Sequence, residues 1–198
     1  MIKNVIFDIG NVLLDFCWKD HIARFGFQGE KADRIAQAMM LGPIWPKLDL
    51  GLESDEDILE QFVAHTPELE QEIRLVFSDL STIVREYEGS VDWIESLKAR
   101  GYHTYYLSNY GERIRREASK ELSFLSHMDG GIMSYTVHLA KPDPAIYQTL
   151  LDRYGLKAED CVFLDDTVRN VEAAQALGIA GIVVTSQEQA KKELETLL

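Results

Sequence analysis

Short apolar runs stand out first in the pattern of hydrophobic and polar positions along the 198-residue chain. Each run is mostly aliphatic or aromatic and is followed by a polar residue, and they lie at residues 4–7, 102–107, 161–164 and 180–184. Runs of this length are typical of strands that are buried on both faces of a sheet. We therefore predict a strand at each of these four places.

Helical spacing separates the last three runs and follows the fourth. Apolar residues there recur every three or four positions, which predicts helices at residues 111–122, 143–154, 167–177 and 186–198. Strands that alternate with helices in this way call for a parallel sheet covered on both faces. The predicted fold class is therefore α/β, with a Rossmann-like parallel sheet core.

A long stretch between the first two runs has a different character. From about residue 18 to about residue 100 the spacing is helical and no segment has the pattern of a strand. Helices are predicted at residues 20–27, 30–41, 55–65, 68–80 and 91–100. We expect residues 1–14 and 89–198 to form the core, and residues 15–88 to form an α-helical insertion after the first strand.

Composition and charge limit the possible partners. The chain has 20 Lys and Arg against 33 Asp and Glu, a net charge of −13. Nucleic acids are held mainly by Lys and Arg, so no nucleic-acid partner is expected, although a single phosphate held locally by a metal ion and a lysine remains possible. No apolar run approaches the length of a membrane span and the amino-terminal segment reads as a strand, so we expect no membrane association and a cytoplasmic location. Cys17 and Cys161 form no paired motif and are expected to be reduced packing thiols.

Polar side chains follow the predicted strands at the edge of the sheet where ligands of parallel sheets bind. Three strand ends and one helix start supply them: Asp8, Ser108 with Asn109, Asp165 with Asp166, and Lys141. Taken singly, each of these residues is typical of a turn or a helix cap. Their shared placement predicts one site with three carboxylates, a hydroxyl and an ammonium group.

The sequence resembles the haloacid dehalogenase-like hydrolase superfamily over nearly the whole chain. All four motifs of that superfamily occur in order, as FDIGNVL, LSN, AKPDPAIY and FLDDTVRN. The segments DIGNVL and KPDPAIY are most similar to the branch of sugar-phosphate phosphatases that includes glucose-1-phosphate phosphatase and the N-terminal domain of soluble epoxide hydrolase. The insertion at 15–88 resembles the small α-helical cap domain of the superfamily.

The resemblance implies a role for each matching residue. Asp8 stands in the position of the nucleophile, Ser108 in that of a phosphate-binding hydroxyl, and Lys141 in that of a fixed positive charge. A carboxylate that attacks phosphorus forms an aspartyl-phosphate and so divides one difficult step into two. The backbone N–H of Asn109 can hold a phosphate oxygen beside Ser108.

A magnesium site is also implied. Asp8 and Asp166 are the expected direct side-chain ligands, Asp165 a direct or water-mediated one, and Gly10 contributes its backbone carbonyl. Crowded carboxylates repel one another, and Mg²⁺, which prefers oxygen ligands, relieves that repulsion.

Gly10 departs from the pattern of the superfamily. Most of its phosphatases carry a second Asp two residues after the nucleophile, whose side chain serves as general acid and base, a contribution of roughly 10²–10⁴ in rate. Without that group, rates should depend steeply on the leaving group unless another residue supplies the proton. Asp15 is the nearest spare carboxylate, although a hinge or solvent-facing role is the simpler interpretation of it.

The expected function is hydrolysis of a small phosphomonoester, with a sugar phosphate as the favoured substrate class. Two alternatives stay open: a dehalogenase, which also lacks the second Asp but works without metal, and a catalytically weak phosphate-binding regulatory domain. In the segment 42–54, Trp45 could stack on a sugar and Lys47 or Asp49 could bind its hydroxyls. A Trp in a helical insertion is more often part of the core. The sequence predicts no oligomeric state.

Overall fold

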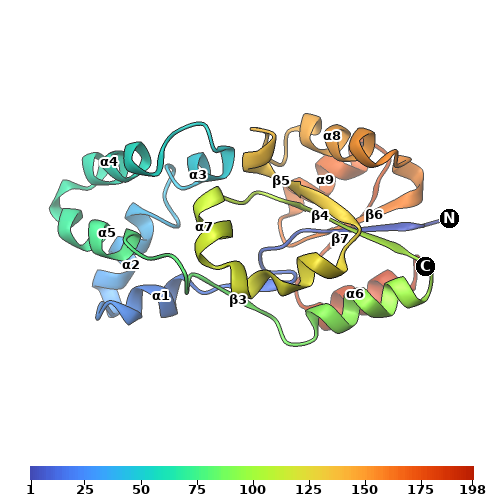
Figure 1. Cartoon of the computed structure of the whole chain (residues 1–198), viewed down its shortest axis with the longest axis horizontal. Helices are drawn as coiled ribbons and strands as arrows, with labels where there is room; N and C mark the ends of the chain where they lie inside the picture. Colours follow the sequence, from blue (N-terminus) through green and yellow to red (C-terminus); the bar gives the residue numbers. More distant parts are fainter.

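A five-stranded parallel sheet organises one half of the molecule in the computed structural model, which describes all 198 residues (Figure 1). The strand order is β5 (Gly130–Met133), β4 (His103–Ser108), β1 (Asn4–Phe7), β6 (Cys161–Asp165) and β7 (Ala180–Val183). Every neighbouring pair is parallel. The amino-terminal strand β1 is thus central, with β4 and β6 on either side.

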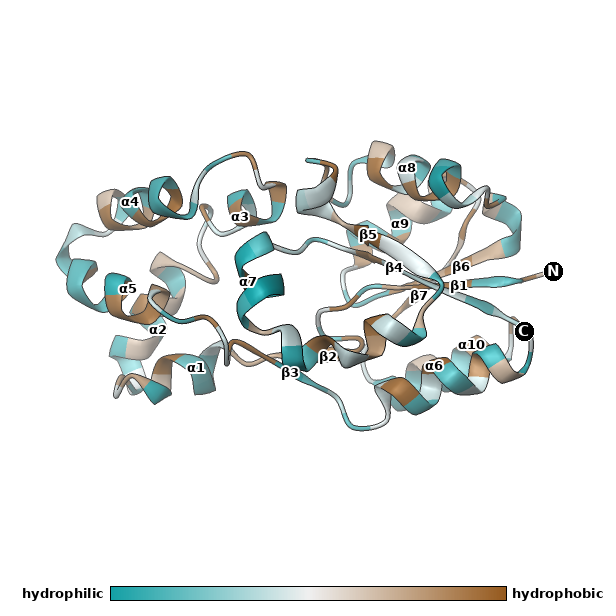
Figure 2. Ribbon diagram, viewed as in Figure 1, coloured by the Kyte–Doolittle hydropathy of each residue, from teal (hydrophilic) through white to brown (hydrophobic).

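Helices cover both faces of this sheet. Those of one face are α8 (Pro144–Tyr154) and α9 (Val168–Ala176), and those of the other are α6 (Ser90–Ala99) and α10 (Gln187–Glu195) (Figure 2). All four residues of β1 are buried, because both of its faces lie under helices. This arrangement confirms the predicted α/β class with a Rossmann-like parallel core.

The helices of the insertion lie together at the other end of the molecule (Figure 1). They are α1 (Trp18–Arg24), α2 (Gly29–Ala38), α3 (Pro46–Leu50), α4 (Asp55–His65) and α5 (Glu70–Phe77). Of these, α3 lies nearest the sheet, where it packs against α7 (Glu112–Glu117) and the short 3₁₀ turn η3 (Ser134–Thr136). The exact boundaries of an insertion at 15–88 stay a prediction.

Two short strands join the insertion to the core, and one of them corrects the sequence-based expectation. β2 (Leu14–Phe16) pairs antiparallel with β3 (Val84–Glu86). The prediction that no strand lies between residues 18 and 100 was therefore wrong. β3 has only three residues, too few for an alternating pattern to be distinguished from a turn.

The sheet also contains a strand that the sequence pattern did not indicate. β5 reads GGIM, and glycine is depleted in strands because it has no side chain to pack. Here both glycines allow close approach of aromatic rings: a Cβ at Gly130 would lie 2.6 Å from the Tyr154 ring, and one at Gly131 would overlap Tyr106.

The lengths of the helices bear on two further points. The helix predicted at 111–122 is shorter, because α7 ends at Glu117 and a 3₁₀ segment, Ser119–His127, follows it. None of the helices is both long and apolar enough to cross a bilayer.

Replacing Gly131 by Ala should lower the free energy of unfolding by about 1–3 kcal/mol, because the added methyl group would overlap the ring and carbonyl of Tyr106. Denaturant unfolding measures this. The control is Gly10→Ala, where an added Cβ meets no atom within 4 Å. A control that is destabilised as much as Gly131→Ala would show that close packing at β5 is not the cause.

Candidate active site

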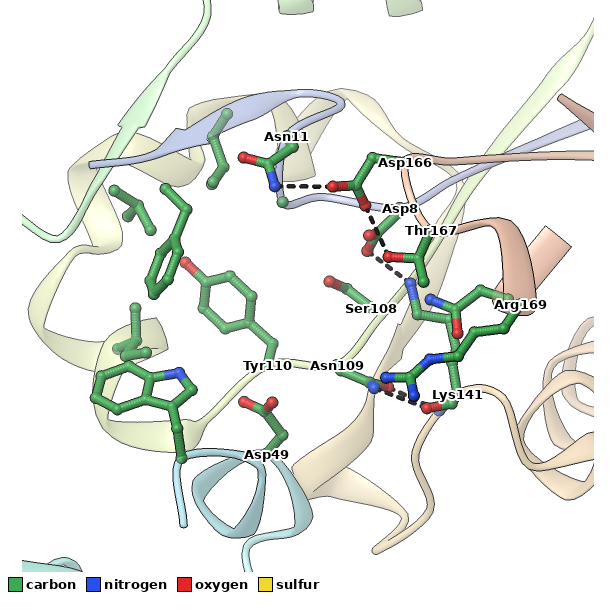
Figure 3. A pocket seen from close by; sticks show the side chains of 17 residues that line it. Asp8, Asn11, Asp49, Ser108, Asn109, Tyr110, Lys141, Asp166, Thr167 and Arg169 are labelled. Carbon is green, nitrogen blue, oxygen red and sulfur yellow. Dashed lines mark hydrogen bonds and ion pairs between the residues drawn. The ribbon is translucent and has the colours of Figure 1, made fainter. Parts of the chain in front are cut away.

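The carboxyl ends of the three central strands meet at one edge of the sheet. β1 leads directly into Asp8, β4 ends at Ser108 and β6 ends at Asp165. A pocket of about 260 Å³ opens there, and its opposite wall comes from the insertion (Figure 3). The structure therefore places these polar groups beyond the ends of the parallel strands, as expected.

Asp8 presents a buried carboxylate to this pocket, with only 7% of the residue exposed. Its Oδ1 atom accepts a hydrogen bond from the backbone N–H of Ile9 at 2.7 Å and lies 2.8 Å from Nζ of Lys141. Burial raises the pKa of Asp8, while the ammonium of Lys141 opposes that rise. The strand and these two contacts fix the direction in which the carboxylate points.

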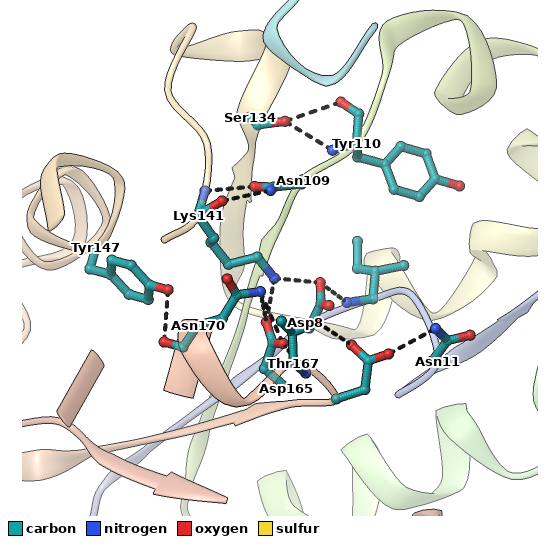
Figure 4. A network of polar contacts seen from close by, with 12 residues as sticks. Asp8, Asn11, Asn109, Tyr110, Ser134, Lys141, Tyr147, Asp165, Thr167 and Asn170 are labelled. Carbon is teal, nitrogen blue, oxygen red and sulfur yellow. Dashed lines mark hydrogen bonds and ion pairs between the residues drawn. The ribbon is translucent and has the colours of Figure 1, made fainter. Parts of the chain in front are cut away.

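Lys141 lies between two carboxylates. Its Nζ is 2.8 Å from Asp8 and 2.6 Å from Oδ2 of Asp165, and the residue is 4% exposed (Figure 4). Burial lowers the pKa of Lys141, but the two carboxylates together outweigh it and leave the pKa above its usual value. The ammonium form is therefore the stable one at neutral pH.

The loop that carries Lys141 is clasped by Asn109. The Lys141 N–H donates to Oδ1 of Asn109 at 2.8 Å, and Nδ2 of Asn109 donates back to the Lys141 carbonyl at 3.0 Å. This reciprocal pair ties the end of β4 to the segment before α8. Asn109 thus positions the lysine in addition to lining the pocket.

Asp165 is fully buried and its oxygens are already engaged. Besides Lys141, they accept hydrogen bonds from the Thr167 N–H at 2.8 Å and from the Asn170 amide at 3.1 Å (Figure 4). It does not belong to the pocket lining. We infer that its main role is to hold Lys141 and the first turn of α9 in place.

Asp166, by contrast, faces the pocket. Its carboxylate accepts from the Asn11 side chain at 2.8 Å and from the Thr167 hydroxyl at 3.3 Å. Asp8, Asp165 and Asp166 each offer an oxygen, and these atoms lie within 4.8 Å of one another. Three carboxylates against one ammonium leave excess negative charge, and carboxylate oxygens are the ligands that Mg²⁺ prefers. The residues present therefore fit a magnesium ion.

Gly10 lines the pocket next to Asp8. It does not have the left-handed backbone conformation, and a Cβ there would meet no atom within 4 Å. The unusual conformation of this turn lies at Asn11 instead, with φ at +55°, where Asn is tolerated better than most residues. The backbone therefore does not require glycine at position 10.

The insertion supplies the other wall. Trp45 lines the pocket and also packs against Phe16 and Phe62, each with a ring-centroid distance of 6.1 Å. It is thus both a core residue of the insertion and a wall of the site. Lys47 does not line the pocket; it pairs with Glu53 at 3.3 Å.

Two carboxylates named from the sequence fall on different sides of the pocket boundary. Asp49 lines the pocket, whereas Asp15 does not. Leu14 and Phe16 do line it, and because successive residues of a strand point to opposite faces, Asp15 between them is directed away. Asp15 is therefore poorly placed to act on a ligand.

The sequence did not single out some residues of the site. Tyr110 has a buried hydroxyl without a hydrogen-bond partner, and Arg169 and Asn170 reach the pocket from α9. Arg169 and Asn170 lie about one helical turn after Asp165 and Asp166, within the same motif, a signal that could have indicated them. Tyr110 lies two residues after Ser108, and nothing in the pattern distinguished it.

Comparison with known proteins shows which family this chain belongs to. The model of a family described as haloacid dehalogenase-like hydrolase matches residues 2–178, which is most of the chain. The match includes all four motifs named from the sequence.

Two curated relatives illustrate the range of the matches. Acyl-CoA dehydrogenase family member 10 of Mus musculus is 31% identical over 207 residues, which cover 99% of this chain but 19% of that protein. Phosphorylated carbohydrates phosphatase of Thermotoga maritima is 30% identical over 142 residues, covering 71% of this chain and 63% of that protein. The chain thus spans about a fifth of the length of the mouse relative.

A solved structure has the same fold. A HAD family enzyme of Bacteroides thetaiotaomicron, crystallised with magnesium and inorganic phosphate, superposes with a TM-score of 0.71 at 22% identity. The superposition covers 94% of this chain and 96% of that chain. At this identity the likeness extends to the fold alone.

Replacing Lys141 by Met in the presence of a chelator should lower the free energy of unfolding at pH 8 by about 3–5 kcal/mol, because two buried carboxylates lose their counter-charge. The pKa of Asp8 in the folded variant would rise further above its unfolded value, so the loss should shrink as the pH falls to 5. Lys98→Met is the control, because Lys98 is partly exposed and its loss should cost about 0–1 kcal/mol. Equal losses in both variants, or no pH dependence, would contradict the buried-charge account.

Proposed function

We propose that this chain, which belongs to the haloacid dehalogenase-like hydrolases, is a magnesium-dependent phosphatase acting on a small phosphomonoester. The observation that carries the proposal is the convergence of Asp8, Lys141, Ser108 and Asp166 on one pocket at the carboxyl ends of parallel strands. Phosphoryl transfer depends chiefly on positioning and charge neutralisation, and this site offers both.

Asp8 is the proposed nucleophile. Its Oδ1 atom contacts the Ile9 N–H and Nζ of Lys141, and Oδ2 is the proposed attacking oxygen. Attack by Oδ2 on phosphorus would form an aspartyl-phosphate, which water then hydrolyses. The buried strand β1 limits the motion of the attacking oxygen and so favours a near-attack geometry.

Lys141 and Ser108 are the proposed phosphate ligands. Both line the pocket beside Asp8, and Lys141 carries a fixed positive charge that the Asn109 clasp holds in place. Charge that builds up on the phosphate oxygens during transfer would meet donors that are already oriented, so little reorganisation is needed.

Asp8, Asp166 and the backbone carbonyl of Gly10 are the proposed holders of magnesium, with Asp165 behind them. When bound, the ion would neutralise the phosphate and the crowded carboxylates. This acidic group also argues against a metal-free dehalogenase.

A sugar phosphate is the proposed substrate class. The pocket volume of about 260 Å³ suits a small molecule, and the phosphatase of Thermotoga maritima is named for phosphorylated carbohydrates. The pocket combines an aromatic wall, Trp45, with a polar group that can bind hydroxyls, Asp49. We propose that the insertion acts as a cap that selects the substrate and excludes water.

Replacing Asp8 by Asn should abolish phosphate release from p-nitrophenyl phosphate. The fold should persist, because Asp165 still pairs with Lys141. A chelator should likewise abolish release by the native protein, and added Mg²⁺ should restore it. Full activity in chelator would revive the dehalogenase alternative, and near-normal release by Asp8→Asn would exclude the proposed nucleophile.

The proposed role of Asp166 as a magnesium ligand can be tested by the dependence of activity on Mg²⁺ concentration. Asp166→Ala should raise the Mg²⁺ concentration needed for half-maximal activity by at least ~10–100-fold, since changes outside the ligand set alone cost that much. Asp143→Ala is a suitable control, because Asp143 caps α8 and does not line the pocket.

Replacing Trp45 by Ala should raise KM for sugar phosphates more than for p-nitrophenyl phosphate, because the lost ring forms part of the pocket wall. The truncation also removes packing against Phe62, so the stability of the insertion needs a control. Phe62→Leu loosens the same aromatic cluster without reaching the pocket. If both variants change the two substrates alike, the effect is loss of packing and Trp45 does not select the substrate.

A further inference from the structure

The pocket contains a carboxyl group that the steps above do not use. Asp49 lies on α3, and its side chain points into the cavity from the wall opposite the strand ends (Figure 3). No protein group hydrogen-bonds to this carboxyl, and none forms an ion pair with it. A pocket-facing acid without a protein partner is free to act on a ligand.

The core fixes the position of this acid, although α3 belongs to the insertion. The hydroxyl of Ser134 donates to the backbone carbonyl of Asp49, and the same hydroxyl accepts from the N–H of Tyr110 at 2.9 Å. The next carbonyl, that of Leu50, lies 2.8 Å from Nδ1 of His138. These contacts dock α3 on the segments that follow β4 and β5.

Close packing supports the same docking. Gly51 ends α3 in the left-handed conformation, and a Cβ there would lie 3.0 Å from the side chain of Tyr135. Gly111 approaches α3 in the same way, because a Cβ added at Gly111 would lie 3.4 Å from the Cβ of Leu48. The backbone of α3 is therefore held on the core from two sides, next to the residue that points into the pocket.

The surroundings of Asp49 favour a proton on it near neutral pH. Burial raises the pKa of Asp49 to about 7, the negative charge of Asp8 adds to the rise, and Lys141 opposes it. Asp166 and Arg169 line the same pocket. On α7 the charge of Arg115 opposes the rise that burial causes in the pKa of Tyr110, and on α3 Lys47 pairs with Glu53. An acid whose pKa lies near the working pH can both give and take a proton.

We infer that Asp49 is the general acid and base of the reaction, in place of the carboxyl group that is missing at Gly10. This inference rests on the proposed phosphatase function. In the first step an oxygen of Asp8 bonds to phosphorus, the bond to the leaving oxygen breaks, and that oxygen takes the proton of Asp49. In the second step Asp49 takes a proton from water, whose oxygen bonds to phosphorus while the bond to Asp8 breaks. Asp8 is then a carboxylate again, Asp49 is protonated, and the products are an alcohol and inorganic phosphate.

The geometry of Gly10 fits this division of roles. A side chain at position 10 would meet no atom within 4 Å, so the backbone does not explain the absence of an acid there. A second pocket carboxyl on the opposite wall makes an acid at position 10 unnecessary. It also leaves space beside Asp8 for the substrate.

The first test compares leaving groups, using kcat/KM with p-nitrophenyl phosphate and with glycerol 2-phosphate. This ratio covers the steps up to release of the alcohol. Asp49→Asn should lower kcat/KM by ~10²–10⁴ for the alkyl phosphate and only a few-fold for the aryl phosphate, whose leaving oxygen needs little protonation. Asp15→Asn, which removes a carboxylate outside the pocket, should change neither value.

The second test restores the acid elsewhere. Gly10→Asp introduced into the Asp49→Asn variant should recover much of the lost activity on glycerol 2-phosphate. The Asp49→Asn variant alone should show a burst of about one nitrophenol per enzyme, because the base for hydrolysis of the aspartyl-phosphate is gone.

Each of the following results would overturn the inference. Equal losses on both substrates, or no loss on either, would mean that Asp49 does not protonate the leaving group. A rise in KM for sugar phosphates with kcat unchanged would identify Asp49 as a ligand of substrate hydroxyls instead. If the native protein with Mg²⁺ releases phosphate from neither substrate, the phosphatase proposal itself fails, and the inference fails with it.

Discussion

The rest of the site depends on one buried ammonium group. Lys141 is held between Asp8 and Asp165 with almost no access to solvent, and each charge of this triad would be costly to bury alone. The surrounding structure adds hydrogen bonds to two members of this triad, Lys141 and Asp165. Asn109 clasps the lysine backbone, and Asn170 and Thr167 complete the hydrogen bonds of Asp165. As a consequence, the proposed nucleophile, the proposed phosphate ligand and two strand ends cannot move independently.

The pocket has two walls of different chemistry. The strand ends supply charge, whereas Leu14, Phe16, Trp45, Val84 and Ile114 give the opposite wall an apolar character. An apolar wall lowers the local dielectric, so each charge at the strand ends would act more strongly on the phosphate of the proposed substrate. Asp49 is the exception on the apolar wall, and its burial there raises its pKa to about 7.

How much of this the sequence predicts depends on the range of the interactions. Asp8, Ser108, Lys141 and the acidic pair follow from local patterns, because each stands at the end of a predicted strand or, for Lys141, just before a predicted helix. The glycine-rich β5 and the three-residue β3 were missed, since close approach of Tyr106 or pairing with β2 decides them and neither is visible locally. Asp49 was named only as a possible hydroxyl ligand. Its place opposite Asp8 comes from α3 docking on η3, a contact between segments about 85 residues apart.

The docking of α3 uses main-chain acceptors. The carbonyls of Asp49 and Leu50 receive the contacts from Ser134 and His138, and a carbonyl is present whatever residue occupies those positions. The side chains of the helix can therefore be exchanged during evolution without loosening its attachment. Relatives with the same scaffold are thus free to place a different group over the substrate, so divergence in substrate preference requires few compensating changes elsewhere in the chain.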